Sequence, residues 1–238
     1  MSKVLIGSVY SDSPRSLTWY KLQIEWLNKT TDFEHVVYPN CDLNFNSSIV
    51  LPRGFQQGQL AHIEGLNSLV NFFKTTDYEN FLLLDSDCFP IRKWTEELLF
   101  SMKGYSVAAI VRQENLDTFA HPAAFFFTRD ILDKIEFGLN LQYNMIGQKF
   151  YETSSNIKEF WPLIRTNKIN YHHILYGVYW DTFYHHGAGS RDLKFRCYEQ
   201  GYYNKESVNW NEQDIFQGLS EEFIKSLCHN RKGLFKVM

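Results

Sequence analysis

Buried strands and amphipathic helices alternate along the first half of the chain. Short apolar runs that end at polar turn residues predict strands at 3–9, 33–38, 81–84, 106–111 and 123–128. Apolar residues at helical spacing predict helices at 16–28, 58–74 and 94–103, with a further helix beginning at 129–135. This alternation predicts an α/β fold with a mostly parallel central sheet flanked by helices.

The pattern becomes less regular after about residue 138. A helix is predicted over 153–165, a loop over 181–215 because of its three glycines, and a last helix over 213–228. No internal repeat or clear linker divides the chain. We therefore expect a single domain over 1–238.

Composition and charge exclude several classes of protein. With 24 Lys and Arg against 27 Asp and Glu, the net charge of −3 argues against binding nucleic acid through a basic surface. The four cysteines show no CxxC spacing, which indicates a reducing compartment rather than a zinc ribbon. We find neither a signal-peptide core nor an apolar run near the ~20 residues of a transmembrane segment. A soluble, cytoplasmic protein is expected.

The strongest chemical signal is Asp85-Ser86-Asp87, directly after the apolar run 81–84. In an open α/β sheet, ligands bind at the carboxyl ends of the strands, where these two carboxylates are expected. Two hard oxygen ligands suit Mg²⁺ or Mn²⁺ that also holds a diphosphate. An ordinary turn capped by aspartates is the alternative, but the preceding buried strand and the following Phe89-Pro90 favour a metal site.

A second signal is the segment 184–191, Tyr-His-His-Gly-Ala-Gly-Ser-Arg. Its two glycines make a turn whose N–H groups can approach a phosphate closely. A histidine just before the turn offers a nitrogen ligand to a divalent metal, and Arg191 can clamp a diphosphate. No Gly-Lys-Ser/Thr follows, so the segment is not a P-loop.

These motifs resemble the GT-A fold glycosyltransferases, in which an Asp-x-Asp motif follows a strand. The helix that begins Gly58-Gln59-Leu60-Ala61-His62 and the opening strand are similar to the elements around that motif in the family. The resemblance covers roughly residues 3–135. It implies that 1–135 binds a nucleotide-diphosphate sugar, and that 136–238 forms the acceptor side and the C-terminal metal and phosphate loop.

The resemblance also implies site residues. Asp87 corresponds to the carboxylate that contacts Mn²⁺ or Mg²⁺, and Asp85 to the one that contacts metal or ribose. Tyr10 and Asp12 correspond to the region that meets the base and ribose, and His62 to a polar residue that reaches the donor.

The family's C-terminal metal-binding histidine corresponds to His185 or His186. We favour His186 because it adjoins the glycine turn. Arg191 would then bind the diphosphate of the donor.

An inverting transferase needs a general base that deprotonates the acceptor hydroxyl. Asp181 is preferred for this role, with Glu212 and Asp214 as alternatives, and the stereochemistry stays open. His121 precedes the strand that would shape the sugar site, where a buried structural histidine is equally expected.

The predicted function is metal-dependent transfer of a sugar from a nucleotide-diphosphate sugar to a glycan, lipid-linked or protein acceptor. A nucleotidyltransferase of related fold is one alternative, but the loop 10–15 after the first strand contains no glycine for a phosphate loop. A non-catalytic carbohydrate-binding protein would explain the 17% aromatic content, but not the two motifs. Many of the aromatic residues between 143 and 203 would line the acceptor side and stack on sugars.

Overall fold

The structure is a computed structural model. It describes residues 3–13, 15–46, 48–54, 56–113, 118–143, 149–166 and 177–187. The predicted last helix at 213–228 lies outside these residues, as do Arg191, Glu212 and Asp214.

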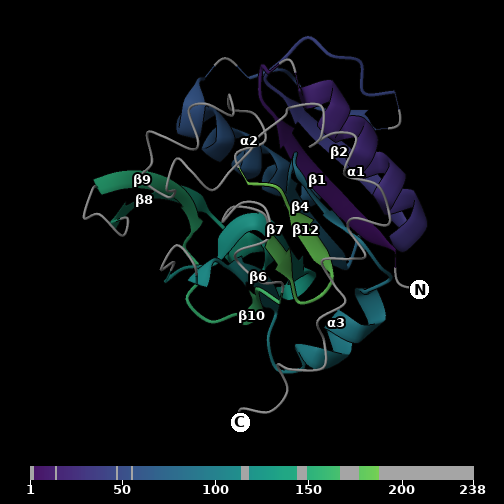
Figure 1. The fold of residues 1–238 in the computed structure, drawn as a ribbon, viewed down its shortest axis with the longest axis vertical. Helices are drawn as coiled ribbons and strands as arrows, with labels where there is room; N and C mark the ends of the chain where they lie inside the picture. Colours follow the sequence, from purple (N-terminus) through teal and green to yellow (C-terminus); the bar gives the residue numbers. More distant parts are fainter. Residues whose placement is uncertain are drawn as a thin grey trace, which may run out of the picture.

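A seven-stranded sheet forms the centre of the molecule, with strand order β10-β6-β7-β4-β1-β2-β3 (Figure 1). β7 is antiparallel to both β4 and β6, and the other described pairings in this sheet are parallel. Its strands are β1 (Val4–Tyr10), β2 (Phe33–Pro39), β3 (Ile49–Val50), β4 (Asn80–Asp85), β6 (Val107–Val111), β7 (His121–Thr128) and β10 (Trp161–Ile164). The mostly parallel α/β sheet that the sequence predicts is confirmed.

Helices cover both faces of this sheet, and two smaller sheets flank it. The helices are α1 (Ser16–Thr30), α2 (Gly58–Phe73), α3 (Thr95–Ser101) and the 3₁₀ helix η2 (Arg129–Lys134). β5 (Cys88–Pro90), β11 (Gly177–Tyr179) and β12 (Phe183–His185) form an antiparallel sheet in the order β11-β12-β5. β8 (Phe137–Tyr143) and β9 (Lys149–Ser155) form a two-stranded antiparallel sheet.

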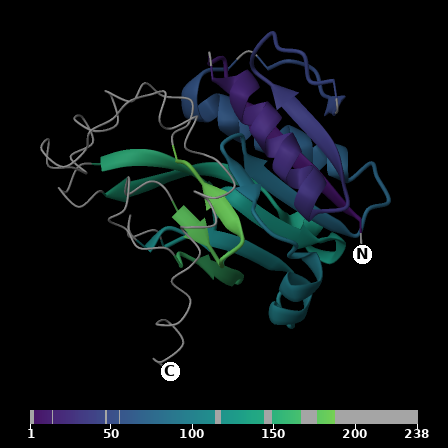
Figure 2. The same cartoon turned by 45° about the vertical axis from the view of Figure 1, so that its right-hand side comes forward.

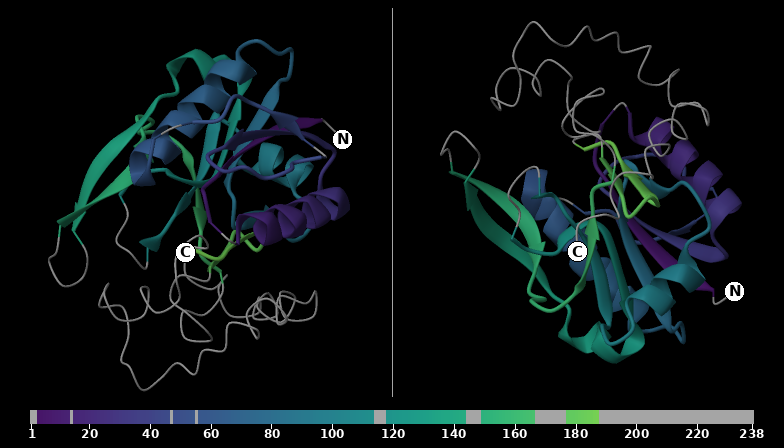
Figure 3. Two further views of the ribbon diagram at one scale, coloured as in Figure 1. Left: turned by 90° about the horizontal axis from the view of Figure 1, so that it is seen from above. Right: turned by 60° about the horizontal axis from the view of Figure 1, so that its bottom comes forward.

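Alternation along the buried strands divides the core into two layers. On β1, Leu5 and Val9 pack with residues of α2, whereas Val4 and Ile6 pack with residues of α1 and α3. Figures 2 and 3 show α1 and α2 on opposite sides of the central sheet. Because successive side chains of a strand point to opposite faces, a strand covered on both faces must be apolar throughout.

The observed buried faces of α1 and α2 differ from the expected ones. On α1 the expected apolar positions include Leu17 and Ile24, but both are only partly buried. The buried face of α1 is Ser16, Trp19, Tyr20, Gln23, Trp26, Leu27 and Thr30. On α2, Leu60 is exposed although helical spacing places it with the apolar residues. The face of a helix that is buried is decided by its neighbours, and here it includes the polar Gln23.

The predicted helix over 153–165 is wrong. Residues 149–155 form β9, which pairs with β8, and 161–164 form β10, which pairs with β6. Pro162 lacks the N–H that a helix interior needs, and β10 takes the edge position where a proline is tolerated. The predicted loop over 181–215 is likewise wrong at 183–185, which form β12.

Within the described ranges, no helix is both long enough and apolar enough to span a membrane.

Candidate metal centre

The two aspartates lie at the edge of the sheet where the parallel strands β1 and β4 end. β4 ends at Asp85, which pairs with Val9 near the end of β1. The chain turns at Ser86-Asp87, the aspartate turn, and enters β5 at Cys88. Asp87 is buried, and the side chain of Asp85 is 19% exposed. A tight turn between two buried strands therefore presents both carboxylates at one edge of the sheet.

β12 brings a histidine to this turn from far along the chain. β12 is antiparallel to β5, with His185 opposite Cys88 and Phe183 opposite Pro90. The N–H of His186 donates to the carbonyl oxygen of Asp87 at 3.0 Å, which ties the end of β12 to the aspartate turn.

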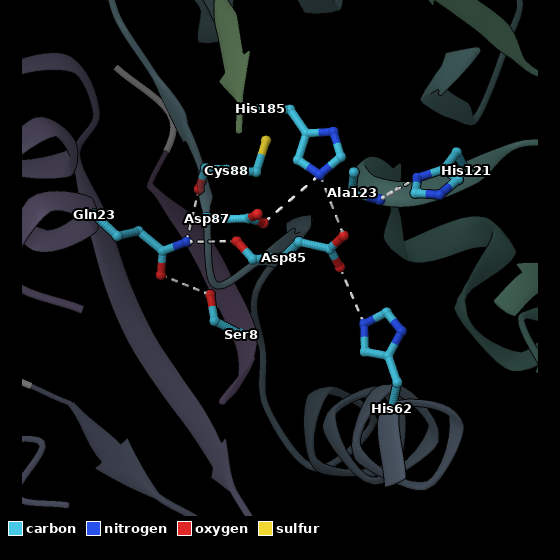
Figure 4. A network of polar contacts seen from close by, with 9 residues as sticks. All are labelled: Ser8, Gln23, His62, Asp85, Asp87, Cys88, His121, Ala123 and His185. Carbon is cyan, nitrogen blue, oxygen red and sulfur yellow. Dashed lines mark hydrogen bonds and ion pairs between the residues drawn. The ribbon is translucent and has the colours of Figure 1, made fainter. Parts of the chain in front are cut away.

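The metal group consists of Asp85, Asp87 and His185, and it has the composition of a metal site (Figure 4). His185 Nε2 lies 3.6 Å from Asp85 Oδ2 and 3.6 Å from Asp87 Oδ1. One potential ligand atom from each residue lies within 4.8 Å of the others. Two carboxylates and one imidazole suit Mn²⁺ or Mg²⁺, with coordination positions left for a substrate.

Hydrogen bonding inside the group also fits a cation. Asp85 Oδ1 and His185 Nδ1 are buried and have no hydrogen-bond partner. His62 Nε2 lies 3.0 Å from Asp85 Oδ1, which is an ion-pair distance without the alignment of a hydrogen bond. A buried carboxylate is costly unless cationic groups surround it, and His62 is one such partner of Asp85. The donor set therefore fits a divalent metal.

His62 and Asp85 stabilise each other's charged forms. Burial by itself raises the pKa of Asp85, but the adjacent His62 outweighs this effect and, with His185, lowers that pKa below its ordinary value. Burial would likewise lower the pKa of His62, but the charge of Asp85 raises it above its ordinary value. The helix α2 thus places an imidazole beside the carboxylate that the sequence assigns to the metal or the ribose.

His186 points away from the carboxylates. Its Nδ1 lies 3.0 Å from the hydroxyl of Tyr184, and its ring centroid lies 4.6 Å from that of Trp19 on α1. Successive strand residues face opposite sides, so when His185 faces the aspartates His186 faces α1. The sequence preference for His186 over His185 is therefore corrected by the geometry: the metal group contains His185 and does not include His186.

Tyr10 is not presented to a ligand. Its side chain is fully buried, and its hydroxyl donates to Gln23 Oε1 at 2.6 Å. Burial raises the pKa of Tyr10 well above its ordinary value. The role at the nucleotide base that the resemblance implies for Tyr10 therefore conflicts with its packing.

Asp12 is exposed in the loop after β1, close to Arg53 and Cys41. Burial, and after it the charge of Asp12, raises the pKa of the Cys41 thiol to about 11.

Asp181 lies in the turn between β11 and β12, with a positive φ of 50°. Its N–H donates to Thr166 Oγ1 at 3.1 Å, and its carbonyl oxygen accepts from Arg92 Nε at 3.0 Å. Three residues separate it from His185, and only the last two of them belong to β12. Among the described residues, Asp181 is not a member of the metal group.

Arg112 and Glu152 are charged neighbours of the metal group that the sequence analysis missed. Arg112 Nη2 lies 3.6 Å from Glu152 Oε1, and the charge of Arg112 helps to lower the pKa of Asp85. Arg112 follows the apolar run of β6, so a charge at the end of a buried strand was the available signal.

His121 lies in the same region, with its ring centroid 6.0 Å from that of His185. Its Nδ1 accepts from the N–H of Ala123 at 3.1 Å, and burial, followed by the charge of Arg112, keeps its pKa well below the ordinary value. His121 is thus a neutral, buried histidine beside the metal group.

The sequence matches no protein-family model, and no curated protein is similar to it. Solved structures are similar at low identity. A TarS fragment from S. aureus has a TM-score of 0.41 at 17% identity, over 58% of this chain and 50% of that one. The mannosyltransferase PcManGT from Pyrobaculum calidifontis, in complex with GDP-Man and Mn²⁺, has a TM-score of 0.37 at 10% identity, over 56% and 46%.

A glycosyltransferase involved in glycosylation of the major capsid of PBCV-1 has a TM-score of 0.34 at 14% identity, over 56% of this chain and 63% of that one. The chain thus matches less than two thirds of the length of each of these three structures. Because all three TM-scores are low, the function is argued from this chain's own residues.

Proposed function

We propose that this protein is a metal-dependent glycosyltransferase that moves a sugar from a nucleotide-diphosphate sugar to a glycan or another hydroxyl acceptor. The observation that carries the proposal is the buried group of Asp85, Asp87 and His185 at the carboxyl end of β4. In an open α/β sheet this is the edge at which ligands bind.

Asp85, Asp87 and His185 would hold Mn²⁺ or Mg²⁺. The metal would supply a Lewis acid that stabilises the negative charge on the departing nucleoside diphosphate. His62 holds Asp85 ionised from the side of α2, so that this carboxylate is ready to bind a cation. Asp12 and the loop after β1 are proposed to meet the nucleoside of the donor.

The general base stays unassigned among the described residues, because Asp181 lies in the turn between β11 and β12 and is not a member of the metal group. Arg191 lies outside the described residues, so its contact with the diphosphate stays a prediction. The same holds for the acceptor side over 136–238 and for a cytoplasmic location.

Thermal shift with a panel of nucleoside diphosphates and nucleotide sugars, with and without Mn²⁺, tests the proposal. A ligand that binds only the folded state raises the melting temperature in proportion to its affinity. We expect at least one nucleotide to stabilise the protein only when Mn²⁺ is present, and the panel also identifies the base and sugar. If no nucleotide shifts the wild type in the presence of metal, the proposal is wrong.

A further inference from the structure

A buried glutamine on α1 contacts the aspartate turn from the side opposite His62. Gln23 is completely buried, and its Nε2 donates to the carbonyl oxygens of Asp85 at 3.0 Å and of Cys88 at 2.7 Å. Its Oε1 accepts from the hydroxyls of Ser8 at 2.9 Å and of Tyr10 at 2.6 Å. Figure 4 shows Gln23 reaching both ends of the turn that carries Asp87.

The orientation of this amide follows from chemistry. A main-chain carbonyl can only accept a hydrogen bond, so the two carbonyls require the NH₂ end of Gln23. The oxygen of the amide must then face Ser8 and Tyr10, whose hydroxyls donate to it. Both donors and both lone pairs of the side chain are used, which is the full capacity of an amide.

The same reasoning fixes the hydrogen bonds behind Gln23. Ser8 has one hydroxyl proton and gives it to Gln23, so it must accept from His35 Nε2, which lies 3.1 Å away. His35 is buried and carries no proton on Nδ1 in this form, so Nδ1 accepts from the hydroxyl of Ser48 at 2.7 Å. Ser48 in turn accepts from the hydroxyl of Tyr20 at 3.0 Å. The hydrogen bonds run in one direction, from Tyr20 to the aspartate turn.

We propose that Gln23 is the positioning residue of the metal centre: it fixes the main chain on both sides of Asp87, so that both carboxylates face His185. This inference rests on the proposed metal-binding function. Asp85 and Cys88 bracket the turn, and their carbonyls are the two points at which it is held from α1. A ligand that is held in place before the metal arrives binds it more tightly, because less conformational entropy is lost on binding.

Mn²⁺ binding by Gln23 variants tests the proposal. Gln23→Glu keeps the shape but replaces the donor toward the two carbonyls with an oxygen, and Gln23→Met removes all four hydrogen bonds. We expect both variants to bind Mn²⁺ about 10-fold more weakly or worse, measured by electron paramagnetic resonance of the free ion. The measurement is made at a temperature where near-ultraviolet circular dichroism shows a folded protein.

Thr30→Val is the matched control. Thr30 lies on the same helix, is buried, and donates to the carbonyl oxygen of Trp26 at 2.7 Å. This variant loses the hydrogen bonds of Thr30 to Trp26 and Thr31, both away from the aspartate turn, so its Mn²⁺ affinity should equal that of the wild type. If folded Gln23→Met binds Mn²⁺ as tightly as the wild type, the inference is wrong while the metal site stands. If the wild type binds no Mn²⁺, the proposed function fails and the inference falls with it.

A measurement on the wild type keeps the test decisive if the Gln23 variants do not fold. The directed chain requires His35 to carry its proton on Nε2, which nitrogen-15 chemical shifts of the imidazole report directly. Finding the proton on Nδ1 would make Ser8 donate to His35 instead of Gln23, and so would contradict the fully used amide from which the positioning role is argued.

Discussion

Two buried polar clusters meet at the aspartate turn, and they are built differently. On the α1 side, Gln23, Ser8 and His35 are neutral and pair every donor with an acceptor. On the other side, Asp85 and His185 are ionisable groups at ion-pair distances of 3.6 Å, and each has a buried polar atom without a hydrogen-bond partner.

The neutral cluster is built to hold the aspartate turn in place, whereas the charged cluster is built to bind a cation. A neutral network in which every donor has an acceptor is complete by itself, whereas the charged cluster keeps buried polar atoms without a hydrogen-bond partner, which a bound cation would stabilise. Both clusters contact the aspartate turn, so the neutral cluster can hold the carboxylates of the charged cluster in place. The following experiments ask whether the clusters differ in this way, from the largest expected effect to the smallest.

Removing a carboxylate from the charged cluster should have the largest effect. Asp87→Ala should weaken Mn²⁺ binding by about 100-fold or more, because the metal loses one of two hard oxygen ligands. Isothermal titration calorimetry measures the change. Asp133→Asn, at a carboxylate 93% exposed, is the control and should leave the affinity unchanged. Equal affinities for Asp87→Ala and the wild type would exclude the site.

The adjacent histidines should give opposite results. His185→Ala should lower Mn²⁺ affinity roughly 10- to 100-fold through loss of a ligand. His186→Ala should instead lower the free energy of unfolding by about 1–3 kcal/mol, because His186 contacts Tyr184 and Trp19. Urea unfolding and Mn²⁺ titration of both variants provide the comparison. A loss of metal binding in His186→Ala with His185→Ala unaffected would reverse the assignment.

The neutral cluster should be sensitive to acid. Burial lowers the pKa of His35 from 6.5 to about 3. Between these pH values the unfolded state is protonated at His35 and the folded state is not. The free energy of unfolding should therefore fall as pH decreases below 6.5, by about 1.4 kcal/mol per pH unit from this group. Urea unfolding at several pH values, compared with His35→Gln, isolates the contribution. An identical pH dependence in both proteins would show that His35 is not buried and neutral.

A single link of the neutral cluster should have the smallest effect. Ser8→Ala removes the hydroxyl between His35 and Gln23, and should lower the free energy of unfolding by about 1–2 kcal/mol. Mn²⁺ affinity should change less than in the Gln23 variants, because Gln23 Oε1 keeps the hydroxyl of Tyr10. A larger loss of metal affinity in Ser8→Ala than in Gln23→Met would show that Ser8 acts on the site by another route.

Prediction from the sequence succeeded where the signal was local. The apolar run 81–84 and the two aspartates after it indicated a buried strand followed by a turn with two carboxylates, and the structure has β4 and the turn at these residues. Prediction failed where a pairing partner decides the structure. Within 153–165, where a helix is predicted, pairing with β8 and β6 places 153–155 and 161–164 in strands.

The choice between His185 and His186 depends on tertiary structure for the same reason. The two residues are identical in type and adjacent in sequence, and a one-residue shift in strand register exchanges their faces. Pairing of His185 with Cys88 sets the register and turns His185 toward the aspartates. Gln23 shows a related effect, since its four hydrogen-bond partners lie outside α1, and Asp85 and Cys88 are far from it in the sequence.

The sequence by itself determined the α/β alternation, the buried strand β4 and the presence of two carboxylates at its end, because each depends on neighbouring residues in the chain. Only the tertiary structure decided which histidine joins them, that Tyr10 faces inward and that Asp181 lies elsewhere. These features depend on strand register and helix rotation, which contacts between segments far apart in sequence determine.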